Sequence, residues 1–382
     1  MPASVWKGVS PEPAVLRVLE AFGLSSVESV SRLTVGTGQE RSLRVRADGD
    51  DWVLKPYVGT VDLGRLLRAH RWEEHLAEAG FPVAPLRRSS SGESLVTDGG
   101  TSYAVHGWVQ GRQVSIADRD DLLACRPGLA GDLGAMVGTL HRISSEREEG
   151  AGAGADGGPD RLLRAPRHAV RALRRPRPRP PWVSRWRALR RQRDTTDFDR
   201  WIIQVLPEVA AQAGRLARQP LAARPGPLDT GLIHHDLNWE NLVLDEELRP
   251  CALLDFDNST RAPWMVELGS AAVVLAGTDR HLVEQFLNGY QSRSPFTIDP
   301  GLVRQAMELK CVQSILNSVL VYLDGDTDTT LREPWCRQLH AALVDLAEPD
   351  AAGPVPARLR GNAHGPRIGR GQQEEGHGPG SI

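Results

Sequence analysis

Between residues 231 and 271 the chain carries an ordered series of polar residues set among short apolar runs. His234 and Asp236 come first, Asn241 follows five residues after the aspartate, and Asp255 opens an Asp-Phe-Asp sequence. The apolar runs 242–244 and 251–256 flank turn-forming residues at 246–249, a pattern that predicts a compact β-hairpin. The Asp-Phe-Asp sequence therefore falls at the end of the second hairpin strand.

These residue types suit one kind of chemistry when they are taken together. Phosphoryl transfer from ATP needs a carboxylate that accepts the hydroxyl proton, and oxygen ligands that hold Mg²⁺ on the phosphates. We expect Asp236 to be the base or orienting group, and Asn241 and Asp255 to be ligands of Mg²⁺, which prefers oxygen donors. Taken singly, each of these three residues is better explained by a polar surface loop, and it is their joint spacing with His234 and the Asp-Phe-Asp sequence that favours phosphoryl transfer. His234 is interpreted as structural, bonding backbone and holding the loop.

The same residues resemble the aminoglycoside phosphotransferase family, the small-molecule branch of the protein-kinase-like fold that also contains homoserine and choline kinases. Its members carry H-G-D-x-x-x-x-N and D-F-D or D-W-E, and here His235 stands in place of the glycine. The resemblance covers roughly residues 30–345. It implies an α+β fold of two lobes, a small antiparallel β lobe that binds the nucleotide and a mainly helical lobe that carries the catalytic loop.

Lysine is rare in this chain, which has only Lys7, Lys55 and Lys310. Lys55 ends a β-rich run whose alternation puts Val53 and Lys55 on one face. It matches the strand lysine that contacts the α- and β-phosphates in this fold, so we expect a catalytic and ATP-binding role. Upstream, Gly36 and Gly38 are candidates for a loop whose backbone N–H groups face phosphate, although a plain turn explains such a pair equally simply.

Two further features follow from the resemblance. Gly107 C=O and Val109 N–H correspond to the backbone groups that hydrogen-bond to adenine at the hinge between the lobes. The glutamate that usually pairs with the strand lysine is Ala69 here. Glu73 lies one helical turn further on the same face and can substitute for it, or Lys55 is held by another group.

Local patterns outline the rest of the chain. Runs at 42–46 and 52–57 around Asp48-Gly49 predict one hairpin, and runs at 93–97 and 102–108 predict another. Residues 66–79 predict a helix that ends at Gly80, and apolar stripes within 129–140, 202–209 and 309–320 predict core helices. We therefore predict a nucleotide-binding lobe at 1–106, a hinge at 107–112, a helical lobe at 113–350 with an insertion at about 145–195, and a disordered tail at 351–382.

Composition excludes several classes of protein. The chain has 382 residues, 40% apolar and 25% charged, and a formal charge of -2, unlike a uniformly basic nucleic-acid coat. Its four cysteines lie far apart, without the spacing of a metal cluster or a secreted scaffold. The first residues lack the apolar run of an export signal, and the sequence has no run of about 18 apolar residues that would predict a membrane span. We expect a cytoplasmic protein that binds neither membrane nor nucleic acid.

The basic residues gather in one segment, since residues 161–193 hold thirteen arginines and no acidic residue. A solvated insertion explains the segment, and so does a surface for an anionic partner. The leading hypothesis is an ATP- and Mg²⁺-dependent phosphotransferase acting on a hydroxyl of an amino alcohol, an amino acid or an antibiotic such as an aminoglycoside. One alternative is a kinase-like enzyme that phosphorylates Ser or Thr of a peptide held by 161–193. The other, suggested by Ala69, is a non-catalytic kinase-like binding module.

Overall fold

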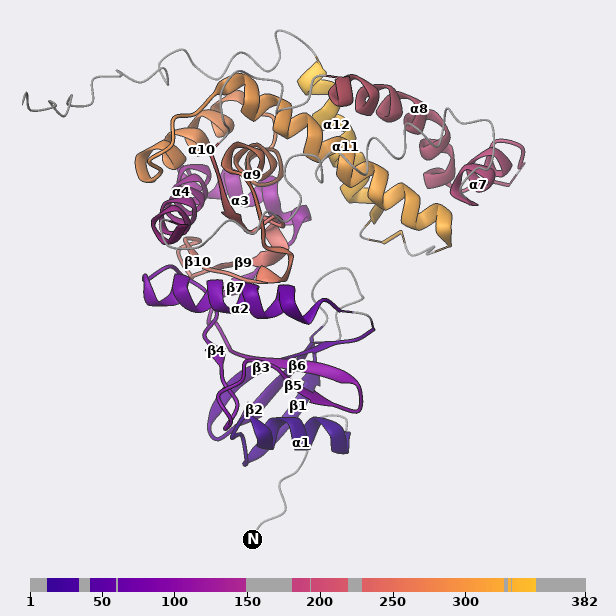
Figure 1. Cartoon of the computed structure of the whole chain (residues 1–382). Coiled ribbons are helices and arrows are strands. Elements are labelled where there is room, and N and C mark those ends of the chain that lie inside the picture. The colour runs from indigo at the N-terminus through magenta and orange to yellow at the C-terminus, as the bar shows by residue number, and fades with distance from the viewer. Residues whose placement is uncertain are drawn as a thin grey trace, which may run out of the picture.

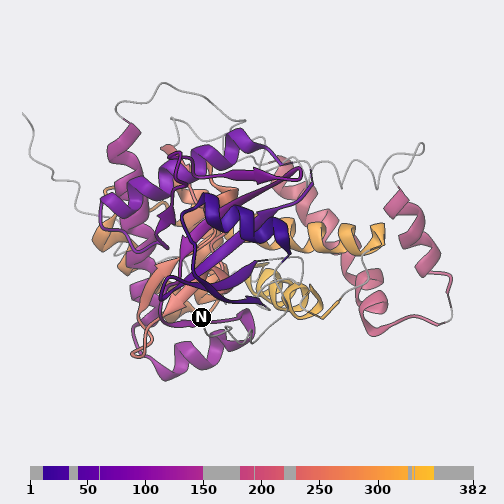
Figure 2. The same ribbon diagram turned by 90° about the horizontal axis from the view of Figure 1, so that it is seen from below.

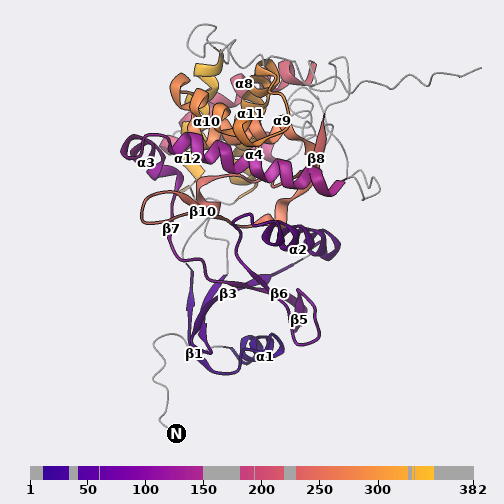
Figure 3. The ribbon, with the colours of Figure 1, turned by 90° about the vertical axis from the view of Figure 1, so that its left-hand side faces the viewer.

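The computed structural model of the chain describes residues 12–33, 42–59, 61–148, 181–192, 194–218, 229–325, 329–330 and 332–347. The chain forms a small sheet-containing lobe and a larger helical lobe, with helix α2 (Leu63–Glu78) lying between the sheet and the helices (Figures 1 and 3). The predicted glycine loop with Gly36 and Gly38, most of segment 161–193 and the tail 351–382 lie outside the described residues.

The small lobe is built on a six-stranded antiparallel sheet in the order β1-β2-β3-β6-β4, with β5 paired to β6. Asp48 and Gly49 join β2 to β3 with φ of 55° and 87°, the left-handed values of a tight two-residue hairpin turn, as their sequence predicts. The predicted strand 93–97 is shorter than expected, and only its end is paired. Helix α1 (Pro13–Ala21) contacts β5. The strands are β1 (Val27–Arg32), β2 (Leu43–Ala47), β3 (Asp50–Tyr57), β4 (Leu86–Arg87), β5 (Val96–Asp98) and β6 (Thr101–Gly107).

Helix α2 follows from its local sequence. Asp62 caps its first turn by accepting a hydrogen bond from the N–H of Arg65 at 3.0 Å, and Gly80 lies just beyond its end with φ of 78°. The buried face of α2 includes Leu66, Ala69 and Glu73. The helix therefore presents one carboxylate, that of Glu73, toward the interior.

A short connection leads from the sheet into the helical lobe. Strand β7 (Arg112–Gln113) pairs with β9 (Leu242–Leu244), which forms the predicted hairpin with β10 (Pro250–Leu253). Gly111 precedes β7 with φ of 144°, and a Cβ there would lie 2.6 Å from Leu244 O, so this approach requires glycine. A second ribbon pairs β8 (Thr230–Ile233) with β11 (Thr260–Pro263).

Two helices of the large lobe approach unusually closely, α4 (Leu129–Glu148) and α10 (Arg280–Arg293). A Cβ on Gly134 would lie 1.9 Å from Phe286 O, and a Cβ on Gly289 would lie 1.9 Å from Gly131 O. The remaining elements are α3 (Arg119–Cys125), α7 (Pro181–Leu189), α8 (Asp197–Arg218), α9 (Trp264–Ala271), a π-helical turn (Ala272–Ala276), α11 (Pro300–Asp324), α12 (Arg332–Ala347), and the 3₁₀ turns Ile116–Asp118, Trp239–Asn241 and Phe256–Asn258.

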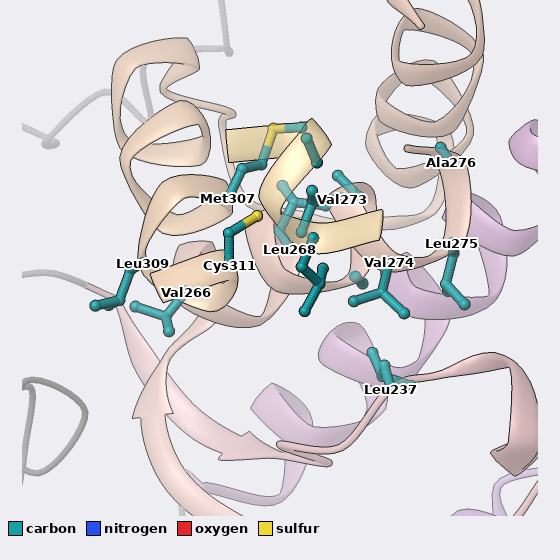
Figure 4. Packing of buried hydrophobic residues seen from close by; sticks show 14 of the residues in the cluster. Leu237, Val266, Leu268, Val273, Val274, Leu275, Ala276, Met307, Leu309 and Cys311 are labelled. Carbon is teal, nitrogen blue, oxygen red and sulfur yellow. The ribbon is translucent and has the colours of Figure 1, made fainter. Parts of the chain in front are cut away.

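Helices α7 and α8 lie on the far side of α11 from α4 and α10 (Figures 1 and 2). The main apolar core spans the large lobe and reaches the segment 234–241 that follows β8. Leu237 belongs to the same buried cluster as Val274 and Leu275 of the π-helical turn (Figure 4). Within the described residues, no helix combines the length and the apolarity needed to cross a membrane.

Candidate active site

The segment 234–241, which follows β8 and is called the catalytic segment from here on, is fixed by His234. This residue is fully buried, and its Nε2 lies 2.9 Å from Leu254 O, so Nε2 is the protonated nitrogen that donates. Its Nδ1 then accepts from the N–H of Asp236 at 3.3 Å. His234 thus bonds to the backbone of Leu254, directly after β10, and to the backbone of Asp236 in its own segment, the structural role that the sequence predicts.

His235 adopts a left-handed conformation with φ of 69°, at the position where the family pattern has glycine. A side chain there costs about 1–2 kcal/mol relative to right-handed backbone. The N–H of His235 donates to Glu267 Oε1 at 2.5 Å, and this bond compensates for the strain. The backbone conformation explains the family's glycine, and the bond to Glu267 holds the backbone of His235 in that conformation.

Glu267, on α9, anchors the catalytic segment by accepting hydrogen bonds from the backbone N–H groups at its start. Only 2% of its surface is exposed, and its Oε2 accepts from the N–H of His234 at 3.1 Å and from His141 Nε2 at 2.9 Å. His141 Nδ1 lies 2.9 Å from the hydroxyl of Tyr290. Burial alone would raise the pKa of Glu267, but the hydrogen bonds from His141 and from the N–H of His235 outweigh it and lower the pKa. The carboxylate therefore stays ionised.

The carboxylate of Asp236 is oriented by two amides. Asn238 Nδ2 donates to its Oδ1 at 3.2 Å, and Asn258 Nδ2 donates to its Oδ2 at 3.3 Å. Asn241 Nδ2 donates to the backbone oxygen of Asp236 at 2.9 Å. These three bonds bring the predicted base and the predicted metal ligand Asn241 together, as their spacing in the sequence leads us to expect.

Lys55 lies against two carboxylates from a distant part of the chain, those of Asp255 and Asp257. Its Nζ is 2.8 Å from Asp255 Oδ1 and 2.8 Å from Asp257 Oδ2, and the hydroxyl of Tyr57 donates to Asp257 Oδ1 at 3.1 Å. Burial would lower the pKa of Lys55, but Asp257 and Asp255 raise it well above its ordinary value. Burial opposes ionisation of Asp255, yet Lys55 holds its pKa below the usual range. Asp255 itself is left-handed, with φ of 62°.

A cavity of about 360 Å³ extends from this ion pair to the hinge. Its walls include Lys55, Asn241 and Asp255, and also the backbone at Gly107 and Val109. The cavity therefore connects six of the predicted site residues, because Glu73 also lines it. Asp236 is not a lining residue, but its backbone oxygen accepts a hydrogen bond from the lining residue Asn241. The other lining residues used below are Val53, Glu73, His106 and Trp108.

Backbone hydrogen bonds fix the hinge. The N–H of Gly107 donates to Pro85 O at 2.7 Å, and that of Trp108 donates to Asp51 O at 3.1 Å. In the part of the chain that the structure describes, the N–H of Val109 has no hydrogen-bond partner. A free donor beside the cavity suits the predicted contact of Val109 with a nucleobase.

Glu73 shares the cavity with Lys55 but pairs differently. Its Oε2 lies 3.3 Å from His106 Nε2, whereas the partners of Lys55 are Asp255 and Asp257. Of the two sequence-based alternatives, the structure has the one in which Lys55 is held by groups other than Glu73. Burial would lower the pKa of His106, but the carboxylate of Glu73 raises it.

Several site residues escaped the sequence reasoning. Tyr57 continues the alternation of Val53 and Lys55, so its position on the same face of β3 was a usable signal. The anchoring role of Glu267 and its bond with His141 gave no signal, because they come from helices that meet only in the folded chain. The ion pair of Lys55 with Asp257 also gave no signal, because these residues are far apart in the sequence and meet only in the folded chain.

The donor set can be tested against the predicted metal. Asn241 uses its Nδ2 on Asp236 O, and its Oδ1 has no protein donor among the described residues. Asp255 presents a carboxylate to the same cavity. An amide oxygen and a carboxylate are ligands that suit Mg²⁺, which keeps several other positions for water and phosphate oxygens. The residues present therefore fit the ion.

The fold and this constellation define a phosphotransferase of the protein-kinase-like class. The chain belongs to the phosphotransferase enzyme family, whose sequence profile matches residues 29–303. This membership confirms the predicted family, the predicted fold class and the prediction of an enzyme that transfers phosphate to an alcohol group.

Solved structures share the fold at low sequence identity. The aminoglycoside phosphotransferase from Alicyclobacillus acidocaldarius has 16% identity and a TM-score of 0.56, over 88% of this chain and 97% of that one. A microcompartment-associated aminopropanol kinase has 15% identity and a TM-score of 0.60, over 87% and 95%. The amicoumacin kinase bound to AMP-PNP and Ca²⁺ has 15% identity and a TM-score of 0.56, over 91% and 96%. No protein of curated function matches this chain.

Proposed function

We propose that this protein transfers the γ-phosphate of ATP, with Mg²⁺, to a hydroxyl group of a small molecule. One observation carries the proposal: Lys55 Nζ of strand β3 lies 2.8 Å from Asp255 Oδ1, just after β10, on the wall of a cavity that also reaches Gly107 and Val109. This arrangement joins a phosphate-binding cation, metal-ligating oxygens and a nucleobase site in one cavity.

The residues have distinct roles in the transfer. The acceptor oxygen attacks the γ-phosphorus, the bond from that phosphorus to the ADP oxygen breaks, and the hydroxyl proton passes to Asp236. Asn238 and Asn258 orient the carboxylate of Asp236 for this step. Lys55 contacts the phosphates and offsets their charge.

Asn241 and Asp255 would hold Mg²⁺, which neutralises phosphate charge when bound. Gly107 C=O and Val109 N–H would contact the adenine. The predicted phosphate-binding role of Gly36 and Gly38 concerns residues outside the described part of the chain. Titration with ATP in the presence and absence of Mg²⁺ tests this part of the proposal separately from the acceptor.

The acceptor belongs to the class of amino alcohols, amino acids or aminoglycoside-like antibiotics. The family and the fold neighbours, among them an aminopropanol kinase and an amicoumacin kinase, support a small hydroxyl compound. They give no support to a peptide acceptor, and family membership favours an enzyme over a binding module.

A panel of such compounds, incubated with Mg²⁺ and ATP, tests the proposal. We expect one class to yield ADP together with a product whose mass has increased by one phosphoryl group. ADP release without any phosphorylated product, across every class of acceptor, would contradict it.

A further inference from the structure

His106 lines the cavity, and its imidazole has no role in the proposed transfer. On the antiparallel ladder His106 of β6 lies opposite Val53 of β3, and opposite residues share one face of a sheet. Both residues line the cavity. His106 also directly precedes Gly107, whose carbonyl is proposed to contact the nucleobase, and both residues line the cavity. On the proposed site, the ring of His106 is therefore expected beside the edge of the base.

Glu73 determines which nitrogen of His106 carries a proton. A carboxylate only accepts hydrogen bonds, so His106 Nε2, 3.3 Å from Glu73 Oε2, is the donor. His106 Nδ1 has no hydrogen-bond partner among the described residues. With Nε2–H fixed, Nδ1 accepts a hydrogen bond when the ring is neutral and donates one when the ring is a cation.

Purine bases differ in the group that would meet this nitrogen. Adenine carries a 6-amino group, which donates, whereas hypoxanthine and guanine carry a 6-oxo group, which accepts. We infer that His106, fixed by Glu73, is a specificity-determining residue that selects between 6-amino and 6-oxo purine nucleotides according to its own charge. The inference rests on the proposed nucleotide site and names the property of the base that this site reads.

Several charged groups act on the His106 ring. Glu73 of α2 and Asp257, after β10, favour the cation, whereas Lys55 of β3 and His70 of α2, whose ring centre is 6.0 Å away, oppose it. Glu73 is the closest of them and raises the pKa of His106 against the effect of burial. The ring of His106 therefore changes from cation to neutral at a pH above the ordinary histidine pKa of about 6.5.

Calorimetric titration with inosine diphosphate and adenosine diphosphate tests the inference without an acceptor. The two nucleotides carry the same sugar and phosphates and differ at the purine 6-position and N1, so the ratio of their affinities cancels the titration of the phosphates. Between about pH 6 and about pH 8.5 we expect the wild-type preference for inosine diphosphate over adenosine diphosphate to fall about tenfold, the worth of one matched hydrogen bond.

Three variants make the test specific. His106→Gln should give a ratio that changes less than about twofold over this range, because an amide can donate or accept at any pH. Glu73→Gln should move the change to lower pH by removing the carboxylate that favours the cation. His281→Gln replaces an exposed histidine of α10 and should keep the wild-type profile.

The outcomes separate this inference from the proposed function. A ratio that is independent of pH in the wild type, or unchanged in His106→Gln, overturns the role of His106 while the nucleotide site stands. Failure of the wild type to bind either diphosphate overturns both. If His106→Gln does not fold, the wild-type profile and the Glu73→Gln shift still decide the question.

Discussion

Glu267→Gln is a direct test of how the catalytic segment is held. The carboxylate accepts three hydrogen bonds, from the N–H of His235 on Oε1, and from the N–H of His234 and His141 Nε2 on Oε2. A glutamine has one oxygen, so its NH₂ must face at least one of these donors. One buried N–H then lacks an acceptor, and the remaining bonds lose their charge assistance.

The expected losses of stability and of turnover in Glu267→Gln follow from these changes. An unsatisfied buried donor costs about 1–3 kcal/mol, and a hydrogen bond to a charged group exceeds a neutral one by about 1 kcal/mol. We expect the free energy of unfolding to fall by about 2–4 kcal/mol at pH 7. The segment also loses the bond that offsets the strain at His235, and a displacement of Asp236 by about 1 Å would lower turnover about a hundredfold.

Urea unfolding followed by tryptophan fluorescence measures the stability, because Trp264 lies 4.7 Å from His141, ring centre to ring centre. Hydrogen exchange of the segment 231–241 reports the same bonds locally and should become faster. The matched control is Glu284→Gln on α10, which removes a more exposed carboxylate paired with Arg280 at 3.0 Å. That pair is worth about 0–1 kcal/mol.

The pH dependence has a definite sign. The lowered pKa of Glu267 gives stability that is present above the unfolded-state value near 4.3 and is lost as pH falls through the folded-state pKa. The deficit of Glu267→Gln should therefore be largest near neutral pH and shrink in acid. A variant with wild-type stability, exchange and turnover would refute the anchoring role of this carboxylate.

Three further outcomes follow from the geometry. Lys55→Met should weaken ADP binding at least about tenfold in calorimetry, because the phosphates lose their cation, while circular dichroism stays unchanged. Gly111→Ala should lower the free energy of unfolding by about 1–3 kcal/mol in urea, since its Cβ meets Leu244 O; an unaffected midpoint would contradict this. Burial raises the pKa of Cys311 to about 12, so a thiol reagent at about pH 8 should label exposed Cys125 and spare Cys311 until unfolding.

Much of the fold could be predicted from local sequence signals. Asp48-Gly49 joins two strands with the expected left-handed turn, and Gly80 ends α2 near the expected residue. These features depend on a few neighbouring residues, whose backbone preferences do not change in the folded chain. The predicted second hairpin strand, in contrast, ends at Leu253 rather than at residue 256, because Asp255 turns into a left-handed conformation.

In the site, too, contacts within one short segment could be predicted from the sequence, whereas contacts between distant elements could not. The spacing from Asp236 to Asn241 predicted their proximity, since only four residues separate them. The contact of Lys55 with Asp257 and the support of Glu267 by His141 depend on elements that are far apart in the sequence. The pairing of Glu73 with His106 was likewise invisible, because the pattern of α2 shows which face Glu73 shares but not which partner faces it.

The central claim is that Asp236 accepts the proton of the acceptor hydroxyl at a site assembled by Lys55, Asn241 and Asp255. The most direct measurement compares wild type and Asp236→Asn in single-turnover transfer of the γ-phosphate to the acceptor found in the panel, with ADP affinity measured in parallel. We expect phosphorylated product to form at least about a hundredfold more slowly in Asp236→Asn at unchanged ADP affinity. Equal rates of product formation in the two proteins would contradict the assignment.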